Sequence, residues 1–273
     1  MLRVEDIDTP RVVKGSSARI LDDLAWLGLD WDEGPVHQSE RTRIYEAALA
    51  QLDAAGLTYP CDCSRAEIAR AASAPHAGEE GKETLYPGTC RDAPRDREFK
   101  RLPAIRLRVP ERSIIAFEDA VCGRVEEDVG KTAGDFVLRR GDGVFAYQLV
   151  VAIDDAAMGV THVVRADDLL GSTARQILLM RMLGYASMPT YAHVPLVVAP
   201  NGERLAKRTR GATVRELAER GTRAEAIVGG LARGLGLVAA DAGSLLTARE
   251  VAARLQPPSS WRRTPWPLPP QWI

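Results

Sequence analysis

Three cysteines in the first 90 residues have a spacing suited to a single metal ion. Cys61 and Cys63 are separated by one residue, and Cys90 lies beyond a polar segment. Cysteines this close in sequence hold their Cβ atoms poorly for a disulfide with each other, but two thiolates on a tight turn can face one ion. Zinc favours a tetrahedron of four ligands that includes thiolates. The pattern therefore predicts a structural zinc ion; the alternative is three reduced, buried thiols without a metal.

The fourth ligand of this zinc site has three candidates: Tyr86, His76 and Cys122. Tyr86 lies four residues before Cys90 in the same turn-like segment, so its hydroxyl could reach the same ion. Residues 73–103 lack apolar periodicity, which predicts an exposed insertion. A metal would order such a segment, because the segment has little core of its own.

A second group of candidate functional side chains, mostly cationic, lies on the basic segment at residues 201–208, directly after an apolar run. Small residues and clustered cations suit a polyphosphate, and the ammonium of Lys207 could follow charge that moves between phosphates. The alternative is a solvated basic turn, because a lone basic loop is a weak motif. Its predicted position beside Arg165, Asp167 and Asp168 at one sheet edge favours phosphate binding.

Arg165 and Tyr147 are candidates for an amino-acid pocket. The guanidinium of Arg165 suits a substrate carboxylate, and the alternative is a surface ion pair with Asp167 or Asp168. Periodicity places Tyr147 in the core, although its hydroxyl could also line the pocket.

The acidic loop of Glu5, Asp6 and Asp8 could hold a substrate ammonium, although most such loops are solvated turns. His162 and His193 lie in apolar runs, so we expect structural roles for both. No Ser/His/Asp or Cys/His arrangement suggests nucleophilic catalysis.

The elements that must position these side chains follow from hydrophobic patterning. Apolar runs at residues 144–153, 161–165 and 193–199 are accompanied by a helical pattern at residues 172–183. Short apolar runs alternating with helical segments are typical of a parallel sheet with crossover helices. Ligands bind such sheets beyond the carboxyl ends of the strands, where Arg165 and the basic segment fall.

The flanking segments have their own signals. We expect helices at residues 16–28, begun by Ser16 or Ser17, at 39–56 and at 64–72, and half-buried strands at 104–109, 113–117 and 134–139. The second helix should bury Tyr45, Ala48, Leu49 and Leu52, and Ser64 with Glu67 should cap the third.

The carboxyl-terminal segment should contain three short helices. Each should begin with a capping box: Thr213 with Glu216, Thr222 with Glu225, and Thr247 with Glu250. The tail at residues 257–273 has six prolines, so we expect no regular element there, only packing through Trp261, Trp266 and Trp272.

Composition sets outer bounds. The chain has 273 residues, of which 45% are hydrophobic and 27% charged, as in ordinary globular proteins. The net charge of −1 gives no overall basic field for nucleic acid, although a local basic face could still bind it. No apolar run could span a bilayer and no signal peptide is recognisable, so we expect a cytoplasmic protein without a membrane partner.

Six stretches together resemble a known family. They are LRVEDIDTPR at 2–11, YPCDCSR at 59–65, YPGTCR at 86–91, FAYQL at 145–149, GVTHVVR at 159–165 followed by Asp168, and GERLAKR at 202–208. In this order they are similar to the glutamyl-queuosine tRNA(Asp) synthetases, short paralogues of the catalytic domain of class I glutamyl-tRNA synthetases. The resemblance covers nearly the whole chain.

The resemblance implies an α/β fold, a Rossmann-type class I catalytic domain with an inserted zinc-containing α+β subdomain and a C-terminal helical segment. The implied divisions are residues 1–60 and 141–210 for the catalytic domain, 61–140 for the insertion, and 211–273 for the helical segment and tail.

The resemblance also implies roles for particular residues. Cys61, Cys63, Tyr86 and Cys90 match the family's zinc ligands, which selects Tyr86 as the fourth. Glu5, Tyr147 and Arg165 match positions that line the glutamate pocket. Arg204, Leu205, Ala206, Lys207 and Arg208 match the K-M-S-K-S-like ATP loop, with Lys207 as its catalytic lysine. The implied reaction activates L-glutamate with ATP and Mg²⁺, without tRNA, and transfers it to queuosine in the anticodon of tRNA(Asp). We expect a monomer.

The sequence also departs from the family pattern. An H-I-G-H-like nucleotide motif and an arginine-led loop are expected before Leu2, and Arg204 and Ala206 replace the usual lysine and serine of the ATP loop. We expect a translation start upstream of Met1; the alternative is a degenerate paralogue. The competing functions are therefore a silent, zinc-stabilised RNA-binding paralogue and a glutamyl-tRNA synthetase fragment.

Overall fold

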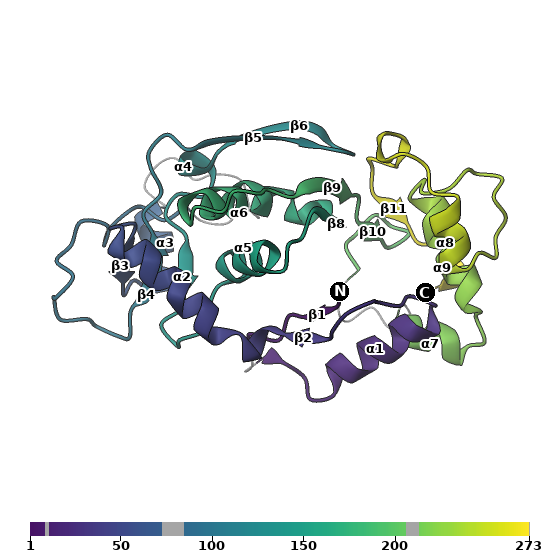
Figure 1. Cartoon of the computed structure of the whole chain (residues 1–273), viewed down its shortest axis with the longest axis horizontal. Helices are drawn as coiled ribbons and strands as arrows, with labels where there is room; N and C mark the ends of the chain where they lie inside the picture. Colours follow the sequence, from purple (N-terminus) through teal and green to yellow (C-terminus); the bar gives the residue numbers. More distant parts are fainter. Residues whose placement is uncertain (9–10, 73–84, 206–212, 273) are drawn as a thin grey trace.

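The computed structural model describes residues 1–8, 11–72, 85–205 and 213–272. A four-stranded sheet in the order β6-β5-β9-β8 extends from the middle of the molecule to its upper edge in Figure 1, where β5 and β6 lie. Its strands are β5 (Ile114–Asp119), β6 (Gly123–Asp128), β8 (His162–Ala166) and β9 (Thr190–Val194). β8 and β9 are parallel, as are β5 and β9, whereas β5 and β6 form an antiparallel hairpin. The sheet is therefore mixed: the prediction of a parallel sheet is confirmed for β5, β9 and β8, and the antiparallel β6 departs from it.

The predicted crossover between parallel strands is present. β8 is followed by α6 (Leu170–Met182), which leads back to β9. Arg165 pairs in register with His193 across these two strands. The crossover thus brings two side chains from distant parts of the sequence to neighbouring positions near the carboxyl ends of their strands.

The prediction of a strand-like run at residues 144–153 is wrong. This segment turns into α5 (Tyr147–Ala157), a helix whose residues from Leu149 to Asp155 are all buried. A helix enclosed on every side has a continuous apolar sequence, which cannot be told from a buried strand by its period. α5 packs between α6 and α2 (Thr42–Ala54), so it forms the centre of the core.

α2 has the buried face that its sequence predicts. Tyr45, Ala48, Leu49 and Leu52 are at most 7% exposed. The helix begins at Thr42 rather than Ser39, because a 3-10 turn (Gln38–Glu40) comes first. Gly56, with φ of 71°, follows its end, in a left-handed conformation that glycine adopts without a Cβ clash.

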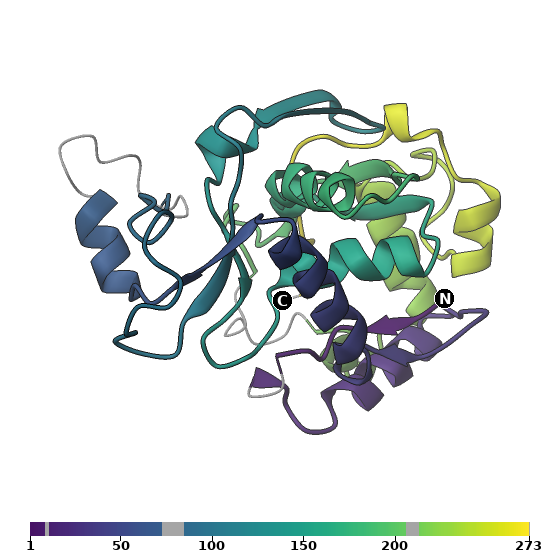
Figure 2. The same ribbon diagram turned by 60° about the vertical axis from the view of Figure 1, so that its left-hand side comes forward.

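The second sheet carries the cysteines. It is antiparallel in the order β3-β4-β7, formed by β3 (Thr58–Cys61), β4 (Ala104–Leu107) and β7 (Val137–Arg139). Figure 2 shows this sheet with α3 (Arg65–Ala72) on one side of the molecule. Ser64 and Glu67 form the predicted capping box at the start of α3. β3 and β6 were not predicted, because neither has a clear alternating pattern.

The amino-terminal segment forms a small parallel sheet of β1 (Arg3–Val4) and β2 (Val36–His37). α1 (Ser16–Trp26) begins after Gly15, whose left-handed backbone occupies the N-cap position, so the prediction of a serine cap is wrong.

The carboxyl-terminal segment contains α7 (Val214–Glu219), α8 (Ala224–Gly234) and α9 (Ala248–Ala253), and a short α4 (Val129–Thr132) lies earlier in the chain. The capping boxes of Thr213 and Thr247 are present. The box at Thr222 is not: Arg223 is the N-cap of α8, without a side-chain cap, and its guanidinium pairs with Glu225.

The tail contains regular elements that were not expected: a short strand and two 3-10 turns (Pro258–Ser260 and Pro270–Trp272). β10 (Val197–Val198) pairs with β11 (Trp266–Pro267) in parallel, so the apolar run at residues 193–199 is divided between two sheets. Pro195 follows β9 and cannot donate to a ladder. The predicted packing of the tail tryptophans is confirmed, since Trp261 and Trp272 are each 8% exposed and Trp266 contacts Trp272 edge to face. Over the described part of the chain, no helix has the length and apolarity to cross a membrane.

Candidate active site and metal centre

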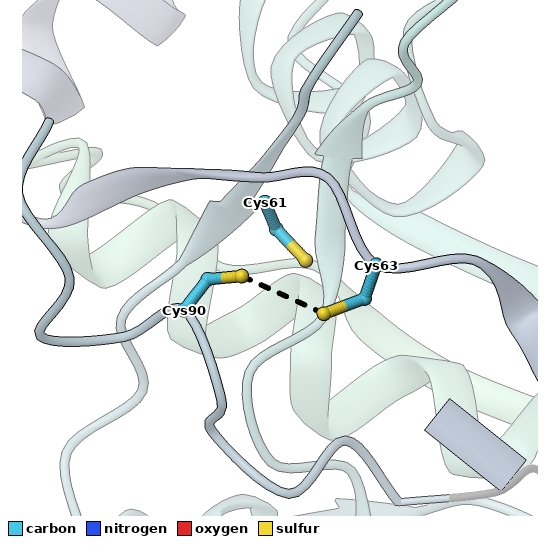
Figure 3. Close-up of side chains that lie close together, drawn as sticks. All are labelled: Cys61, Cys63 and Cys90. Carbon is cyan, nitrogen blue, oxygen red and sulfur yellow. Dashed lines mark hydrogen bonds between the residues drawn. The ribbon is translucent and has the colours of Figure 1, made fainter. Parts of the chain in front are cut away.

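The thiols of Cys61, Cys63 and Cys90 converge. Their sulfurs all lie within 4.8 Å of one another, and Figure 3 shows the three side chains pointing inward from the end of β3 and from the loop before β4. The sulfurs of Cys63 and Cys90 are 3.5 Å apart. Zinc–sulfur bonds of about 2.3 Å separate two sulfurs of a tetrahedron by roughly 3.8 Å. The cluster is therefore compatible with one zinc ion.

Tyr86 occupies the fourth side of the cluster. Its hydroxyl lies 3.4 Å from the sulfur of Cys61, 3.7 Å from that of Cys63 and 2.8 Å from the backbone nitrogen of Cys90. Of the other two candidates, Cys122 lies in the turn between β5 and β6 and contacts the carbonyl of His193 instead. His76 lies outside the described residues. Tyr86 is thus the candidate that the described structure places at the cysteines.

Cationic side chains surround the cluster. A guanidinium nitrogen of Arg97 lies 3.3 Å from the sulfur of Cys90 and 2.7 Å from Asp62. The guanidinium of Arg106 lies 3.8 Å from the ring centroid of Tyr86, within the range of a cation–π contact. These charges would offset part of the negative charge that three thiolates carry.

Burial and hydrogen bonding shift the acidities within the cluster. Burial raises the pKa of Cys63 to about 12, aided by the neighbouring cysteines, and burial also raises the pKa of Tyr86. Burial would raise the pKa of Cys61, but the Tyr86 hydroxyl and the N–H of Cys63 outweigh it and lower that pKa. Because zinc binds deprotonated ligands, its binding here would release protons.

Arg165 lies near the end of β8 with four protein contacts on its guanidinium. Nε donates to Nε2 of His193 at 3.1 Å, and Nη2 donates to Oγ1 of Thr173 at 2.8 Å and to the carbonyl of Leu169 at 3.4 Å. Nη1 lies 3.5 Å from the hydroxyl of Tyr147. The predicted alternative, an ion pair with Asp167 or Asp168, does not form. Within the described residues, no carboxylate lies within ion-pair distance of Arg165.

Tyr147 and Glu5 lie on the same cleft. Tyr147 begins α5 and is 36% exposed, so its prediction as a core residue is wrong. Both residues line a cavity of about 1260 Å³. Burial raises the pKa of Tyr147, with smaller opposing effects of the Arg165 charge, which lowers it, and the Glu5 charge, which raises it.

The acidic loop is more structured than a solvated turn. Asp6 accepts hydrogen bonds from the backbone N–H and the hydroxyl of Ser39, at 2.9 and 2.8 Å, and contacts the ring of His37 at 3.0 Å. Asp8 pairs with Arg140 at 3.1 Å. Glu5 pairs with Arg3 at 3.1 Å and stays exposed at the cleft. Asp8 lines the same cavity as Glu5, so both of these carboxylates face the space that a ligand would occupy, whereas Asp6 does not line it.

The basic segment is described only at its start. Arg204 pairs with Asp168 at 2.6 Å, and Leu205 packs against the core of the carboxyl-terminal segment. Ala206, Lys207 and Arg208 lie outside the described residues. Asp168 belongs to the 3-10 turn (Asp167–Leu169) whose last carbonyl accepts from Arg165. The beginning of the basic segment and Arg165 thus contact the same turn.

His193 was predicted to have only a structural role, and the structure places it at the candidate substrate site. It is 1% exposed, as a structural histidine would be, but it contacts the candidate substrate arginine directly. Its Nδ1 lies 2.6 Å from the carboxylate of Asp119, a residue not singled out from the sequence. The available signal was that His193 begins an apolar run, two residues before a proline, which does not reveal a partner on another strand.

Comparison with known proteins gives one family. The family model for class I tRNA synthetases (E and Q), catalytic domain, matches residues 1–265. The Glutamyl-Q tRNA(Asp) synthetase of Geobacter sulfurreducens is 52% identical over 209 residues, which are 76% of this chain and 64% of the relative. That of Symbiobacterium thermophilum is 47% identical over 251 residues, which are 87% of this chain and 76% of the relative.

Among solved structures, the glutamate-tRNA synthetase from Elizabethkingia anophelis superposes with a TM-score of 0.80 at 26% identity. The superposition covers 99% of this chain and 61% of that structure. The similarity therefore extends over the whole of the present chain, while the chain itself spans about two thirds or less of several relatives. The chain belongs to the class I tRNA synthetases (E and Q), catalytic domain, and within them to the glutamyl-Q tRNA(Asp) synthetases.

Proposed function

We propose that this chain activates L-glutamate with ATP to glutamyl-adenylate in the absence of tRNA and transfers the glutamate to queuosine of tRNA(Asp). The observation that carries the proposal is the guanidinium of Arg165, which faces Tyr147 beside a cleft and has no carboxylate partner among the described residues. A buried or half-buried cation without a counter-charge is costly, and a substrate carboxylate would supply that charge. The names of the relatives support glutamate and tRNA(Asp) as substrates.

The chemistry divides among the candidate residues. Arg165 and Tyr147 would bind one carboxylate of glutamate, and Glu5 would attract its ammonium. The reacting carboxylate oxygen attacks the α-phosphorus of ATP, forming an acyl–phosphate bond while the bond to pyrophosphate breaks. Lys207 would stabilise the negative charge that gathers on the phosphates. Mg²⁺, when bound, would neutralise the pyrophosphate that leaves.

The cysteine cluster has a separate role in this proposal. Cys61, Cys63, Tyr86 and Cys90 would hold one zinc ion that joins β3 to the loop before β4 and orders the insertion. Its role would be structural, and two of its ligands, Cys63 and Tyr86, line the same large cavity as Glu5 and Tyr147. Zinc removal should therefore lower stability.

A transfer assay tests the acceptor. Labelled L-glutamate, ATP and the chain are incubated with tRNA(Asp) that carries queuosine, and in parallel with tRNA(Asp) that carries guanosine at the same position. We expect label on the first tRNA alone. Label on both tRNAs, attached at the 3′ end, would instead indicate the activity named for the structurally similar glutamate-tRNA synthetases. Label on neither, with adenylate formed, would reject the proposed acceptor.

A further inference from the structure

A row of polar side chains runs from β5 across β9 to Arg165. The carboxylate of Asp119 lies 2.6 Å from Nδ1 of His193, and Nε2 of His193 accepts from Nε of Arg165 at 3.1 Å. The side chains of Asp119 and His193 are both 0% exposed. Neither residue has a role in the reaction proposed above. Two fully buried polar groups that end on a substrate-facing guanidinium call for an explanation beyond packing.

The hydrogen-bond donors around the row determine the protonation state of His193. An arginine Nε–H can only donate, so Nε2 of His193 must accept and cannot carry a proton. Asp119 accepts from the backbone N–H groups of Val121, Cys122 and His193, at 3.0, 2.8 and 3.1 Å. The carboxylate thus stays ionised and takes the Nδ1–H of the ring. His193 is therefore neutral, with its proton on Nδ1.

The direction of each pKa agrees with this assignment. Burial lowers the pKa of His193, against the opposing effect of Asp119. Burial would raise the pKa of Asp119, but the N–H of Cys122, the ring of His193 and further backbone N–H groups outweigh it and lower that pKa. Near pH 7 the pair is thus a carboxylate and a neutral imidazole.

This arrangement fixes the orientation of the guanidinium. Nε of Arg165 is held by His193, and Nη2 is held by Thr173 and the carbonyl of Leu169. Because the guanidinium is planar and rigid, holding two of its nitrogens sets the direction of the third. Nη1 is then directed to the hydroxyl of Tyr147. Thr173 also contacts Nε2 of His193 at 3.1 Å, which closes the network.

We propose that His193, held by Asp119, is a positioning residue that orients Arg165 for the carboxylate of the substrate. The assignment of that carboxylate to glutamate rests on the proposed function. The device is sensitive to acid, because a proton on Nε2 would oppose the N–H of Arg165 and turn the guanidinium away. The groups that face His193 are Asp119 on β5, Arg165 on β8, Asp167 in the following turn, Thr173 on α6, Tyr191 on β9 and the thiol of Cys122.

Two substitutions of His193 distinguish a role in orienting Arg165 from a role in core packing alone. The amide oxygen of His193→Gln can take the place of Nε2 and accept from Arg165, whereas the shorter His193→Asn reaches only toward Asp119. Loss of a buried, charge-assisted hydrogen bond weakens binding roughly tenfold or more. Isothermal titration with the full chain should show this loss of L-glutamate affinity in His193→Asn, a loss of a few fold at most in His193→Gln, and unchanged ATP affinity in both. Equal glutamate affinity in wild type and a folded His193→Asn would overturn the proposal.

Glutamate affinity measured over a pH series gives a second test, because a role of His193 in packing alone would not make that affinity depend on the imidazole. Because burial lowers the pKa of His193, glutamate affinity of the wild type should fall only as the pH is lowered below the ordinary imidazole pKa of about 6.5, and His193→Gln, which has no imidazole to protonate, should lack this loss. An identical pH dependence in both would contradict the proposal.

Nitrogen-15 NMR of the imidazole and guanidinium distinguishes failure of this inference from failure of the proposed function. At pH 7.5, His193 should carry its proton on Nδ1, and the Arg165 Nε–H signal, assigned by its loss in Arg165→Lys, should exchange slowly with water. If the wild type shows the Nδ1 proton of His193 and the slowly exchanging Arg165 Nε–H but does not bind glutamate, the proposed substrate is wrong while the positioning of Arg165 stands. An Nε2–H tautomer or an imidazolium would reject the positioning, even if glutamate binds.

Discussion

The hydroxyl of Tyr147 lies 3.5 Å from Nη1 of Arg165. Tyr147 is the first residue of α5, and Arg165 is the fourth residue of β8. A neutral phenol beside a guanidinium leaves the positive charge of the arginine uncompensated. A ligand carboxylate that enters the cleft would meet a charged donor and a neutral donor at one point. This pairing is the basis of the first prediction.

Arg165→Lys should weaken glutamate binding by roughly tenfold to a hundredfold, because an ammonium cannot reproduce a planar, charge-assisted fork. Equilibrium binding of L-glutamate measures the effect. Arg124→Lys is a matched control, since Arg124 is 66% exposed on the β6 edge of the sheet. Unchanged affinity in Arg165→Lys would show that Arg165 is outside the substrate site.

Lys207→Ala should slow adenylate formation by roughly a hundredfold and leave glutamate affinity nearly unchanged. The reason is that an ammonium on phosphate charge acts mainly in the transition state. Rapid-quench measurement of adenylate and equilibrium binding of glutamate separate the two effects. Equal losses in both quantities would remove the assignment of Lys207 to the phosphates.

Metal analysis of the purified chain should find one zinc ion per chain, and Cys61→Ser should lose it. Cys122→Ser is the control, because Cys122 is exposed and lies away from the cluster. Zinc-bound wild type should also be more stable than the chelator-treated protein, since binding to the folded state adds to the free energy of unfolding. A metal-free wild type that is equally stable would return the three cysteines to ordinary buried thiols.

Asp154→Asn should lower the free energy of unfolding by about 2–4 kcal/mol. Asp154 is 0% exposed and accepts from Tyr45 at 2.8 Å, Gln38 at 2.9 Å and Arg41 at 2.8 Å. The substitution places an amide N–H against these donors and leaves Arg41 without a counter-charge. Urea unfolding measures the loss. Asp92→Asn, at an ion pair whose aspartate is 85% exposed, should change stability by less than about 1 kcal/mol.

Local patterns in the sequence were enough to predict several elements. The 3.6-residue period of α2 gave its buried face, and the Ser64–Glu67 box gave the start of α3, because both signals lie within one or two helical turns. The cysteines gave a metal hypothesis from their spacing alone. The resemblance then chose Tyr86 among three candidates, and the structure places its hydroxyl against two of the sulfurs.

Features that depend on distant partners could not be predicted. α5 is enclosed by α2 and α6, so its sequence lost the polar face that marks most helices. β10 has a partner about 70 residues later in the tail, and the contact between Arg165 and His193 depends on how two strands align. In each of these cases a tertiary contact, absent from the local sequence, decided the outcome. The capping box at Thr222 has no such explanation: α8 begins with Arg223 as its N-cap, without a side-chain cap.

The exchange of labelled pyrophosphate into ATP, dependent on L-glutamate and without tRNA, tests the central claim most directly. It should be measured on the zinc-loaded 273-residue chain. We predict exchange with L-glutamate, none with L-glutamine, and a strong reduction in Arg165→Lys. A folded, zinc-loaded protein that shows no glutamate-dependent exchange would contradict the proposed activation of glutamate.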